Sequence, residues 1–360
     1  MKALVAMSGG VDSSVAAALM LEQGHDVVGV TLKQWQGADG SMPTSGCCTV
    51  ADAEDARRVA AQLDVPYYVL DHVADFRERV VEPFGAAYVA GRTPNPCIDC
   101  NRRVRFRTLL ERTEALGCDF LVTGHYARVK NEGGSYKLLK GKDPSKDQSY
   151  VLHMLGQAEL SQVRLPIGEF TKPEVRAEAE RLGLRTAAKP DSQDICFVKD
   201  DYRSFLRENF SDVAQPGQLV DTGGKVLGEH EGTVDFTIGQ RKGLGVALGE
   251  PRYVVDIQPS TATVVIGKKA DLEALGCTLE EVSFVSGGVP PQGTEVDVKI
   301  RYRSAPVPAV VSSIPTGVEL MFRDPQLAVA PGQAAVMYAG DEVVGGGTIA
   351  TVVKGDRVTE

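Results

Sequence analysis

The segment Ser8–Ser14, which reads SGGVDSS, constrains the fold of this chain more than any other stretch. It follows an apolar run, Ala3–Met7, that predicts a buried strand, and it precedes an alanine-rich stretch, Val15–Gln23, that predicts a helix. A strand, a glycine turn and a helix N-terminus bring unpaired backbone N–H groups and the positive end of the helix dipole to one bend. Gly9 and Gly10 let an anion approach the backbone closely. The sequence therefore predicts a phosphate-binding loop.

Two better-known nucleotide loops are excluded at this position. The segment has no Gly-Lys-Ser/Thr ending, as a Walker A loop would, and no G-x-G-x-x-G spacing for a dinucleotide. It resembles instead the pyrophosphate loop of the ATP pyrophosphatases, which release pyrophosphate and adenylate an oxygen of their substrate. The resemblance implies ATP as the nucleotide. Asp12 is expected either to cap the first helix or to orient Mg²⁺, and the sequence leaves both roles open.

Composition narrows the class of protein. A chain of 360 residues is longer than one hydrophobic core usually supports, so we expect two or three domains. The net charge of −9 argues against a general polyanion binder, so contacts to nucleic acid must come from local basic patches. No apolar run in the sequence approaches the length of a membrane span. With a strand expected directly after Met1 and Lys2, and seven cysteines without a disulfide-scaffold pattern, we expect no signal peptide, no membrane partner and a cytoplasmic location.

The first part of the chain alternates predicted strands and helices. Strands are expected at Val27–Leu32, Pro66–Leu70 and Phe120–Thr123, and helices at Ala51–Leu63 and Val175–Leu182, the last behind a capping box that begins at Thr171. This order predicts an α/β domain with a parallel sheet and right-handed crossovers. The ligand is then expected at the carboxyl ends of the strands, where the segment Ser8–Ser14 falls.

After about Phe210 the pattern changes to short alternating segments punctuated by glycine and proline. Such segments are Tyr253–Ile257, Thr263–Ile266, Val296–Tyr302 and Val318–Phe322. They predict β structure with few helices, including a small barrel at the end of the chain. We therefore expect a catalytic domain over residues 1–208, a β-rich linking domain over 209–276 and a C-terminal β-barrel over 277–360.

Three cysteines lie in contexts that favour chemistry. Cys97 and Cys100 occur in the sequence NPCIDCN, directly before an arginine-rich helix start, and both features lower the pKa of a thiol. Cys196 lies between the last predicted helix and the β region. A single C-x-x-C is compatible with half a zinc site, a redox pair or neither, and the lack of a second pair argues against a zinc finger. The remaining cysteines, Cys47, Cys48, Cys118 and Cys277, are expected to be small buried apolar residues.

Six motifs occur in the order seen in the tRNA-specific 2-thiouridylases, and the chain resembles this family from its first residue to at least Gln333. The motifs are Ser8–Ser14, Asn95–Phe106, Thr123–Tyr126, Lys146–Tyr150, Asp191–Phe197 and Gly239–Gly245. The pyrophosphate loop alone is typical of all ATP pyrophosphatases. The cysteine motifs together with Gly239–Gly245 narrow the resemblance to this one family.

The resemblance implies a sulfur transfer to the wobble uridine, position 34, of certain tRNAs. ATP, with Mg²⁺ on its phosphates, adenylates the oxygen on carbon 2 and releases pyrophosphate, which converts a poor leaving group into a good one. A sulfur carried as a persulfide on Cys196 then reaches carbon 2, and AMP leaves. Cys100, at the position of the family's nucleophile, finishes in a disulfide with Cys196. A cysteine desulfurase or a sulfur relay protein is the implied sulfur donor.

One residue departs from the family pattern and leaves a second mechanism open. The family often has Asn-Pro-Asp where this chain has Asn95-Pro96-Cys97. An aspartate there can act as a base or orient the uridine, and a cysteine does not replace it in that role. Cys97, Cys100 and Cys196 together are compatible with a 4Fe–4S cluster that leaves one iron open, as in related tRNA thiolation enzymes.

The family resemblance also implies the binding residues. ATP contacts are expected at Ala6, Met7, Ser8, Gly9, Gly10, Val11, Asp12, Ser13, Leu32 and Gly124. Contacts to the tRNA or to the target base are expected at Asn95, Pro96, Cys97, His125, Asp147, Gln148, Ser149, Arg301, Tyr302 and Gln333. For His125 a structural hydrogen bond competes with a role as a base, and for Leu32 a place in the core competes with an ATP contact.

Local basic patches are candidates for phosphate contacts. Arg102, Arg103, Arg105 and Arg107 follow the cysteine loop directly, and residues 128–146 carry six basic and two acidic side chains. For the second patch, a solvated hairpin is the alternative interpretation. Arg301 and Arg303 are expected on one face of a strand.

Two other function classes remain open from the sequence. One is an adenylating ligase with the same loop but without thiolation, and the other is an RNA-binding module or nucleotide sensor with an inherited loop. Neither needs reactive cysteines, so serine variants of Cys100 and Cys196 separate these classes from a sulfurtransferase.

Overall fold

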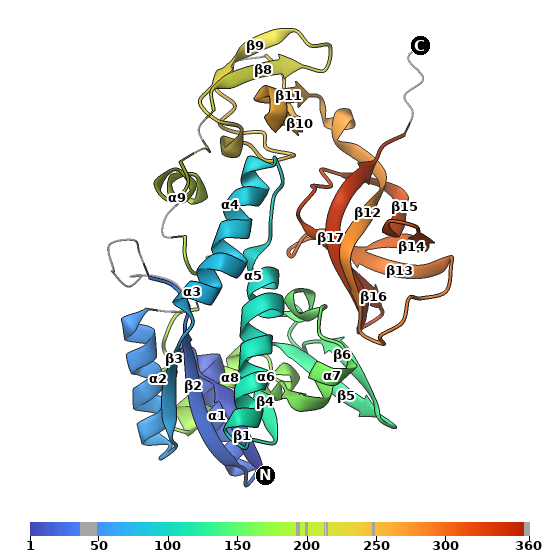
Figure 1. The fold of residues 1–360 in the computed structure, drawn as a ribbon. Helices are drawn as coiled ribbons and strands as arrows, with labels where there is room; N and C mark the ends of the chain where they lie inside the picture. Colours follow the sequence, from blue (N-terminus) through green and yellow to red (C-terminus); the bar gives the residue numbers. More distant parts are fainter. Residues whose placement is uncertain are drawn as a thin grey trace.

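The computed structural model describes residues 1–36, 49–191, 195–198, 201–211, 213, 215–246 and 249–355. Within these residues an α/β domain, a small β domain and a β-barrel occupy three regions of the molecule (Figure 1). The expected fold class is confirmed. Among the helices that the structure describes, none combines the length and the apolar character needed to cross a membrane.

A five-stranded parallel sheet forms the centre of the first domain, with the order β3-β2-β1-β4-β7 among its described strands. Its strands are β1 (Lys2–Ala6), β2 (Asp26–Lys33), β3 (Tyr67–Asp71), β4 (Phe120–Val122) and β7 (Val163–Arg164). Its main helices are α1 (Val11–Glu22), α2 (Val50–Gln62), α6 (Phe106–Ala115), α7 (Gln157–Gln162) and α8 (Lys172–Arg181). β1 is buried along its whole centre because apolar clusters cover both faces of the sheet.

Two helical columns rise from this sheet towards the other domains (Figure 1). The first comprises α3 (Val73–Phe76), a π-helical turn at Arg77–Val81 and α4 (Glu82–Val89). The second comprises α5 (Pro96–Asp99), a π-helical turn at Cys100–Arg105 and α6. The two π turns pack against each other, and Cys100 is the first residue of the second one. Wide turns of this kind frequently occur at functional sites.

The middle of the chain folds as predicted into short β segments. α9 (Tyr202–Asn209) leads into a sheet of β8 (Gly217–Asp221), β9 (Val226–His230), β10 (Tyr253–Gln258) and β11 (Thr263–Gly267). The strand order is β10-β11-β8-β9, with β11 and β8 parallel and the other pairs antiparallel.

The end of the chain forms a closed barrel because β12 pairs with both β15 and β17. Its strands are β12 (Glu273–Phe284), β13 (Thr294–Lys299), β14 (Val307–Ile314), β15 (Gly317–Leu327), β16 (Ala334–Ala339) and β17 (Glu342–Val353). A hairpin of the first domain, β5 (Ala127–Glu132) and β6 (Ser135–Lys140), joins this sheet at Glu342, opposite Leu139. The expected domain boundary after residue 276 falls inside β12, and the division into three ranges stays a prediction.

Candidate functional site

The predicted phosphate loop lies where the strand order of the parallel sheet reverses. β2 and β3 extend to one side of β1, and β4 and β7 extend to the other. The loop after β1 and the segment Thr123–His125 after β4 therefore meet at the carboxyl edge of the sheet, where α/β folds bind their ligands. Leu32 reaches the same edge near the end of β2 and is buried.

The loop is held by its own serines. The backbone N–H of Ser8 donates to Oγ of Ser13 at 3.0 Å, and Oγ of Ser14 donates to the carbonyl of Gly10 at 2.8 Å. Gly10 occupies the N-cap of α1 and supplies no side-chain cap, so the first N–H groups of the helix are available to an anion. The capping role considered for Asp12 is therefore wrong, because Asp12 lies in the first turn of the helix.

Two glycines allow the walls of this cradle to pack closely. A Cβ at Gly124 would lie 2.7 Å from the backbone N of Ser13, which brings β4 against the start of α1. Gly9 has φ +72°, and a Cβ there would lie 2.1 Å from the carbonyl oxygen of Asp52. A side chain at either position would displace neighbouring backbone, so both glycines are required by the shape of the loop.

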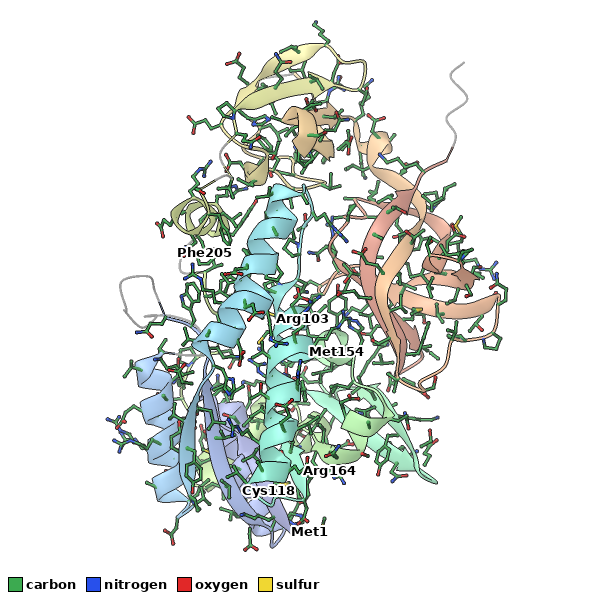
Figure 2. The ribbon with its side chains drawn as sticks, viewed as in Figure 1. Met1, Arg103, Cys118, Met154, Arg164 and Phe205 are labelled. Atoms are coloured by element: carbon green, nitrogen blue, oxygen red, sulfur yellow. The ribbon has the colours of Figure 1, made fainter. Side chains whose placement is uncertain are left out.

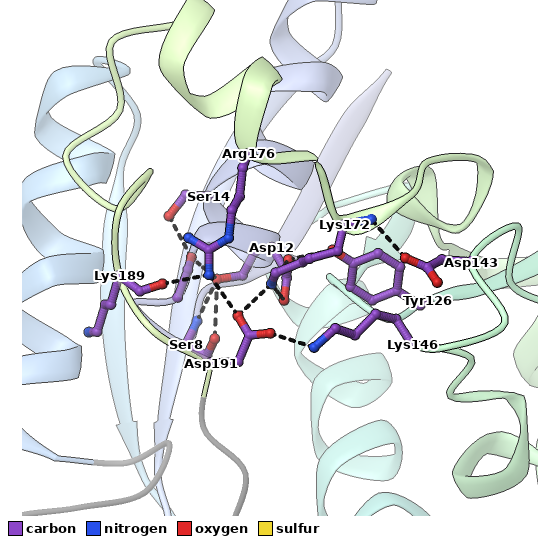
Figure 3. A network of polar contacts seen from close by, with 12 residues as sticks. Ser8, Asp12, Ser14, Tyr126, Asp143, Lys146, Lys172, Arg176, Lys189 and Asp191 are labelled. Atoms are coloured by element: carbon purple, nitrogen blue, oxygen red, sulfur yellow. Dashed lines mark hydrogen bonds and ion pairs between the residues drawn. The ribbon is translucent and has the colours of Figure 1, made fainter. Parts of the chain in front are cut away.

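Charged side chains gather beside the loop, among them Lys172 and Arg176, for which the sequence analysis expected no role (Figure 3). Nζ of Lys172 lies 2.8 and 2.9 Å from the two carboxylate oxygens of Asp12 and 2.7 Å from Asp191. Lys146 and Arg176 also pair with Asp191, at 2.7 and 3.1 Å. We name these five residues the Asp191 cluster. Burial acts to raise the pKa of Asp191, but the hydrogen bonds from Lys146 and Lys172 outweigh it and leave that pKa lowered.

Two further groups complete the surroundings of the loop. The hydroxyl of Tyr126 donates to Asp12 at 2.7 Å, and burial, together with the Asp12 charge, raises the pKa of this phenol. Nζ of Lys189 binds the carbonyl of Gly9 at 3.0 Å and the carboxylates of Asp52 and Asp55 at 2.7 Å. Lys189 thus ties the loop to the start of α2. For Lys172 the sequence signal was the capping box that begins at Thr171, whereas Lys146 opens the motif Lys146–Tyr150.

The structure brings Cys100 and Cys196 into one apolar cluster. Cys100 is buried within it and accepts a hydrogen bond from Nε2 of Gln34 at 3.3 Å. Cys196 is partly exposed and packs against the same cluster. Its neighbour Phe197 is fixed by the rings of Phe84 and Phe76, at 5.2 and 5.6 Å.

This cluster draws on three parts of the chain. Trp35, directly after β2, and Phe205 of α9, labelled in Figure 2, lie with ring centres 5.7 Å apart. Residue 35 follows Gln34, which contacts Cys100, while Phe205 packs on Phe197 beside Cys196 at 5.2 Å. The two thiols are therefore positioned by one shared core. Neither forms a disulfide here.

The other described cysteines differ in how far they are exposed to solvent. Cys97 is exposed, and Asn95 caps α5 by accepting a hydrogen bond from the Cys97 N–H at 3.2 Å. Among the residues that the structure describes, no group of three His, Cys, Asp or Glu side chains is arranged to hold a metal ion. Cys97, Cys100 and Cys196 therefore do not fit an iron–sulfur cluster in this arrangement. Cys277 is buried as predicted, Cys118 only partly, and Cys47 and Cys48 lie outside the described residues.

Predicted contact residues of the barrel bind the first domain near the loop of Asn95, Pro96 and Cys97 and at Asp147. Nε2 of Gln333 donates to the carbonyl of Thr93 at 2.8 Å, two residues before Asn95. The hydroxyl of Tyr302 donates to the carbonyl of Asp147 at 3.2 Å. Burial is the main cause of the raised pKa of Tyr302, and the charges of Asp147 and then Cys97 add to it. Residues distant in sequence thus meet at Thr93 and at Asp147.

Several of the predicted contact side chains are bound internally. The carboxylate of Asp147 accepts the N–H groups of Gly141 and Ser149 at 3.0 and 3.1 Å and the Ser149 hydroxyl at 3.0 Å. Oε1 of Gln148 accepts the N–H of Tyr126 at 2.9 Å. These side chains shape the loop that they belong to.

His125 is buried and sits 2.7 Å from the hydroxyl of Thr123. Burial lowers the pKa of His125 to about 3, and Arg105 adds to the effect. The imidazole is therefore neutral near pH 7, which supports the structural role for this side chain.

The buried histidines predict an acid-sensitive fold. Burial also lowers the pKa of His153 to about 4. Below pH 6.5 the unfolded chain binds protons that these folded histidines do not, so stability is full above that pH and falls as the pH drops towards 3. When the pH falls from 7 to 5, we expect each of these two histidines to lower the free energy of unfolding by about 2 kcal/mol. The fall is measured as a lower urea midpoint. His125→Gln and His153→Gln should each flatten this pH dependence.

The partly exposed His72, paired with Asp75 at 3.1 Å, provides the matched control. His72→Gln should keep the pH dependence of the parent protein. An unchanged slope in both buried variants would contradict the assignment.

Two basic patches expected from the sequence lie in other surroundings than predicted. Arg301 and Arg303 lie in a bend after β13 rather than on a strand, because β13 ends at Lys299. In the hairpin β5–β6, Arg128 and Lys137 pair with Asp341 and Glu342 at 3.2 and 3.0 Å. The hairpin is therefore docked on the barrel and not free in solvent.

The arginines after Cys100 are also paired. Arg102 lies 2.9 Å and Arg103 2.5 Å from the carboxylate of Glu281, on the bulged part of β12. Figure 2 shows Arg103 on the helical column beside the barrel. These pairs join the Cys100 helix to the C-terminal barrel.

A hollow in the described part of the chain lies away from the phosphate loop and the thiols. It measures about 990 Å³ and lies between the middle sheet and the barrel, lined by residues that include Asp221, Asp256 and Lys354. None of the predicted site residues lines it. The chemistry at the carboxyl edge of the parallel sheet thus does not depend on this hollow.

Three family models match the chain in succession. The tRNA methyl transferase HUP domain matches residues 1–200, the tRNA methyl transferase PRC-barrel domain matches 203–268, and the aminomethyltransferase β-barrel domain matches 275–349. Among solved structures, a 4-thiouridine synthetase–RNA complex with bound ATP covers 57% of this chain and 50% of its own, at 19% identity and a TM-score of 0.36.

Curated relatives match over nearly the whole length. A protein of Carboxydothermus hydrogenoformans is 50% identical over 354 residues, covering 97% of both chains. Proteins of Roseiflexus castenholzii and Moorella thermoacetica are each 47% identical, covering 97% and 98% of this chain and 99% and 100% of their own. All three bear the name tRNA-specific 2-thiouridylase MnmA.

Proposed function

The chain belongs to the tRNA-specific 2-thiouridylase family, and we propose that it transfers sulfur to carbon 2 of the wobble uridine, position 34, of tRNA in an ATP-dependent reaction. The observation that carries the proposal is the arrangement of one domain. A phosphate-binding loop lies at the reversal point of the sheet, and two thiols share an apolar cluster in the same domain. The loop alone suits any adenylating enzyme; the two thiols favour sulfur transfer.

In the first half-reaction the oxygen on carbon 2 attacks the α-phosphorus of ATP. Pyrophosphate leaves, and the uridine becomes an adenylated intermediate. The N–H groups at the start of α1, beside Gly10, Val11 and Asp12, are proposed to bind the phosphates. Gly124 supports this role because it lets β4 pack directly against the start of α1.

In the second half-reaction the terminal sulfur of a Cys196 persulfide adds to carbon 2. AMP leaves with the original oxygen, so carbon 2 is joined to Cys196 through two sulfurs. The Cys100 thiolate then attacks Sγ of Cys196, the bond between the two persulfide sulfurs breaks, and its electron pair stays on the sulfur bound to carbon 2. The products are 2-thiouridine and a Cys100–Cys196 disulfide, which an external dithiol reduces before the next turnover.

Mg²⁺ is the metal that this chemistry implies, since it neutralises charge on the phosphates. The described residues contain no group of three side chains suited to hold a metal by themselves, so most of its ligands must be phosphate oxygens and water. An iron–sulfur cluster on Cys97, Cys100 and Cys196 does not match the arrangement of these residues.

The tRNA is proposed to approach the loop that carries Cys97. Gln333 binds Thr93, two residues before Asn95, and Tyr302 binds Asp147 of the first domain, which supports the contact residues expected from the family. The uridine must leave the anticodon stack to reach the thiols, and a loop presents its bases splayed. A cytoplasmic location, a sulfur-donor protein and the domain ranges 1–208, 209–276 and 277–360 are part of the same proposal.

Glu281 offers a test of the RNA surface. Glu281→Gln removes the charge that pairs with Arg102 and Arg103, so positive charge becomes available to tRNA phosphates, mainly on Arg102 because Arg103 keeps its ion pair with Asp99 at 3.3 Å. We expect tRNA affinity to rise about threefold or more at low salt. The slope of log affinity against log salt concentration should become steeper by about one to two units, because each newly contacted phosphate releases about one counterion. Filter binding across a salt series measures both.

The control for this test is Glu295→Gln, which breaks an exposed pair with Arg323 on the barrel. It should leave affinity and salt slope unchanged. If Glu281→Gln behaves like this control, Arg102 and Arg103 do not face the RNA.

The direct test of the function uses purified protein, tRNA transcript, ATP and a cysteine desulfurase. We expect 2-thiouridine and AMP in equal amounts by mass spectrometry. Failure to form 2-thiouridine under anaerobic, reducing conditions, also after iron–sulfur reconstitution, would overturn the proposal. Release of pyrophosphate without thiolation would favour an adenylating ligase instead.

A further inference from the structure

Lys172 is a buried cation beside the predicted phosphate loop. Its side chain is 9% exposed, although it carries a charge and lies at the first position of α8. A buried ammonium persists only where nearby groups compensate its charge. Here Asp12 and Asp191 do so, and the ring of Tyr126 lies 5.7 Å from Nζ. Lys172 therefore reaches the first turn of α1 in a fixed orientation.

The charges around Lys172 suit the arrival of an anion. Asp12 places a carboxylate in the first turn of α1, which by itself would repel phosphate. Lys172 bonds both oxygens of that carboxylate and compensates it. The N–H groups and dipole of α1 then remain as the attractive field at the loop.

Lys172 can exchange one partner at low cost. Asp191 also accepts Lys146 at 2.7 Å and Arg176 at 3.1 Å. If Lys172 turns from Asp191 to a phosphate oxygen, Asp191 still keeps two cations. The exchange therefore leaves no unpaired buried carboxylate.

We propose that Lys172 binds the pyrophosphate part of ATP, and binds free pyrophosphate after the first half-reaction. This assignment rests on the proposed function and adds a side-chain ligand to a loop otherwise made of backbone N–H groups. A lysine ammonium is a common partner of phosphate oxygens because it donates charge-assisted hydrogen bonds. The other members of the Asp191 cluster position it.

The test is calorimetric titration of the full chain with pyrophosphate and Mg²⁺, without tRNA or sulfur donor. Lys172→Met should weaken pyrophosphate binding about tenfold or more. Lys142→Met is the matched control, because Lys142 pairs with Glu174 at the start of the same helix and is exposed. The control should bind within about twofold of the parent, and equal binding by Lys172→Met would overturn the proposal.

A second comparison, in a protein without the Asp12 charge, distinguishes two roles of Lys172. One role is direct binding of pyrophosphate, and the other is neutralisation of Asp12. In an Asp12→Asn background, Lys172→Met should still weaken pyrophosphate binding about tenfold. If it then has no effect, Lys172 acts only by neutralising Asp12 and direct binding is overturned. Should Lys172→Met fail to fold, Lys172→Gln carries the same comparison, since its amide can still donate to Asp12. Because the titration contains no tRNA, its outcome does not depend on whether the protein forms 2-thiouridine.

Discussion

Cys196→Ser and Cys100→Ser should each reduce 2-thiouridine formation by about 1,000-fold or more while tRNA-dependent release of pyrophosphate continues within about tenfold. A serine oxygen can neither carry the persulfide sulfur nor form the disulfide that releases it. The adenylation half-reaction uses the loop at the carboxyl edge of the sheet and not the thiols. Serine is close to cysteine in volume, so the apolar cluster around Cys100 keeps its packing. Quantifying 2-thiouridine and pyrophosphate in the same reaction checks both halves.

Cys118→Ser is the control, since Cys118 lies apart from the thiol cluster, after α6. It should retain full thiolation. If either Cys100→Ser or Cys196→Ser keeps more than about a tenth of the activity, the sulfur route through that thiol is wrong.

Cys97→Asp extends the test to the mechanism. The variant restores the residue common in the family at this position. On the persulfide route it keeps thiolation, because Cys97 is not needed for sulfur transfer. If it abolishes thiolation and the anaerobically purified parent absorbs as an iron–sulfur protein, the cluster mechanism replaces the persulfide route.

Gly10→Ala should raise the KM for ATP about 30-fold or more without unfolding the protein. In the ligand-free protein a Cβ at Gly10 would meet only Oγ of Ser8, at 3.5 Å, and the backbone angles, φ −90° and ψ 166°, suit alanine. The methyl group would instead occupy the space through which a phosphate approaches the N–H groups of α1. Thermal unfolding and ATP-dependent pyrophosphate release measure stability and KM.

Substitutions of two other glycines serve as comparisons for Gly10→Ala. Gly288→Ala, in open space after β12, should change neither KM nor stability. Gly9→Ala should damage the loop itself, because φ is +72° and the new Cβ would collide with Asp52. A wild-type KM in Gly10→Ala would mean that phosphate does not lie against this turn.

The sequence predicted the secondary structure of the α/β domain well because its signals are local. The strand expected at Ala3–Met7 is β1, Lys2–Ala6, and the helix expected at Ala51–Leu63 is α2, Val50–Gln62. The capping box at Thr171 is confirmed. Apolar runs and caps act within a few residues, so they can be recognised without knowledge of the fold.

Interactions between distant segments were not predictable in this way. Arg102 and Arg103 meet Glu281 across 179 and 178 residues, and the basic hairpin β5–β6 docks on the barrel. From the sequence, both looked like surfaces for phosphate. A charge pattern shows which residues carry charge, but the fold decides which charges face each other.

By itself, the sequence determined the phosphate loop, the α/β order of the first domain and the β character of the rest, and it identified the candidate reactive thiols. Glycine turns, hydrophobic periodicity and the residues around each cysteine are local features, so they can be recognised without the fold. Only the tertiary structure decided what surrounds them. It placed Lys172 and Asp191 beside Asp12 and gathered Cys100 and Cys196 into one core. Such neighbours come from elements far apart along the chain, and packing of the sheet, helices and barrel brings them together.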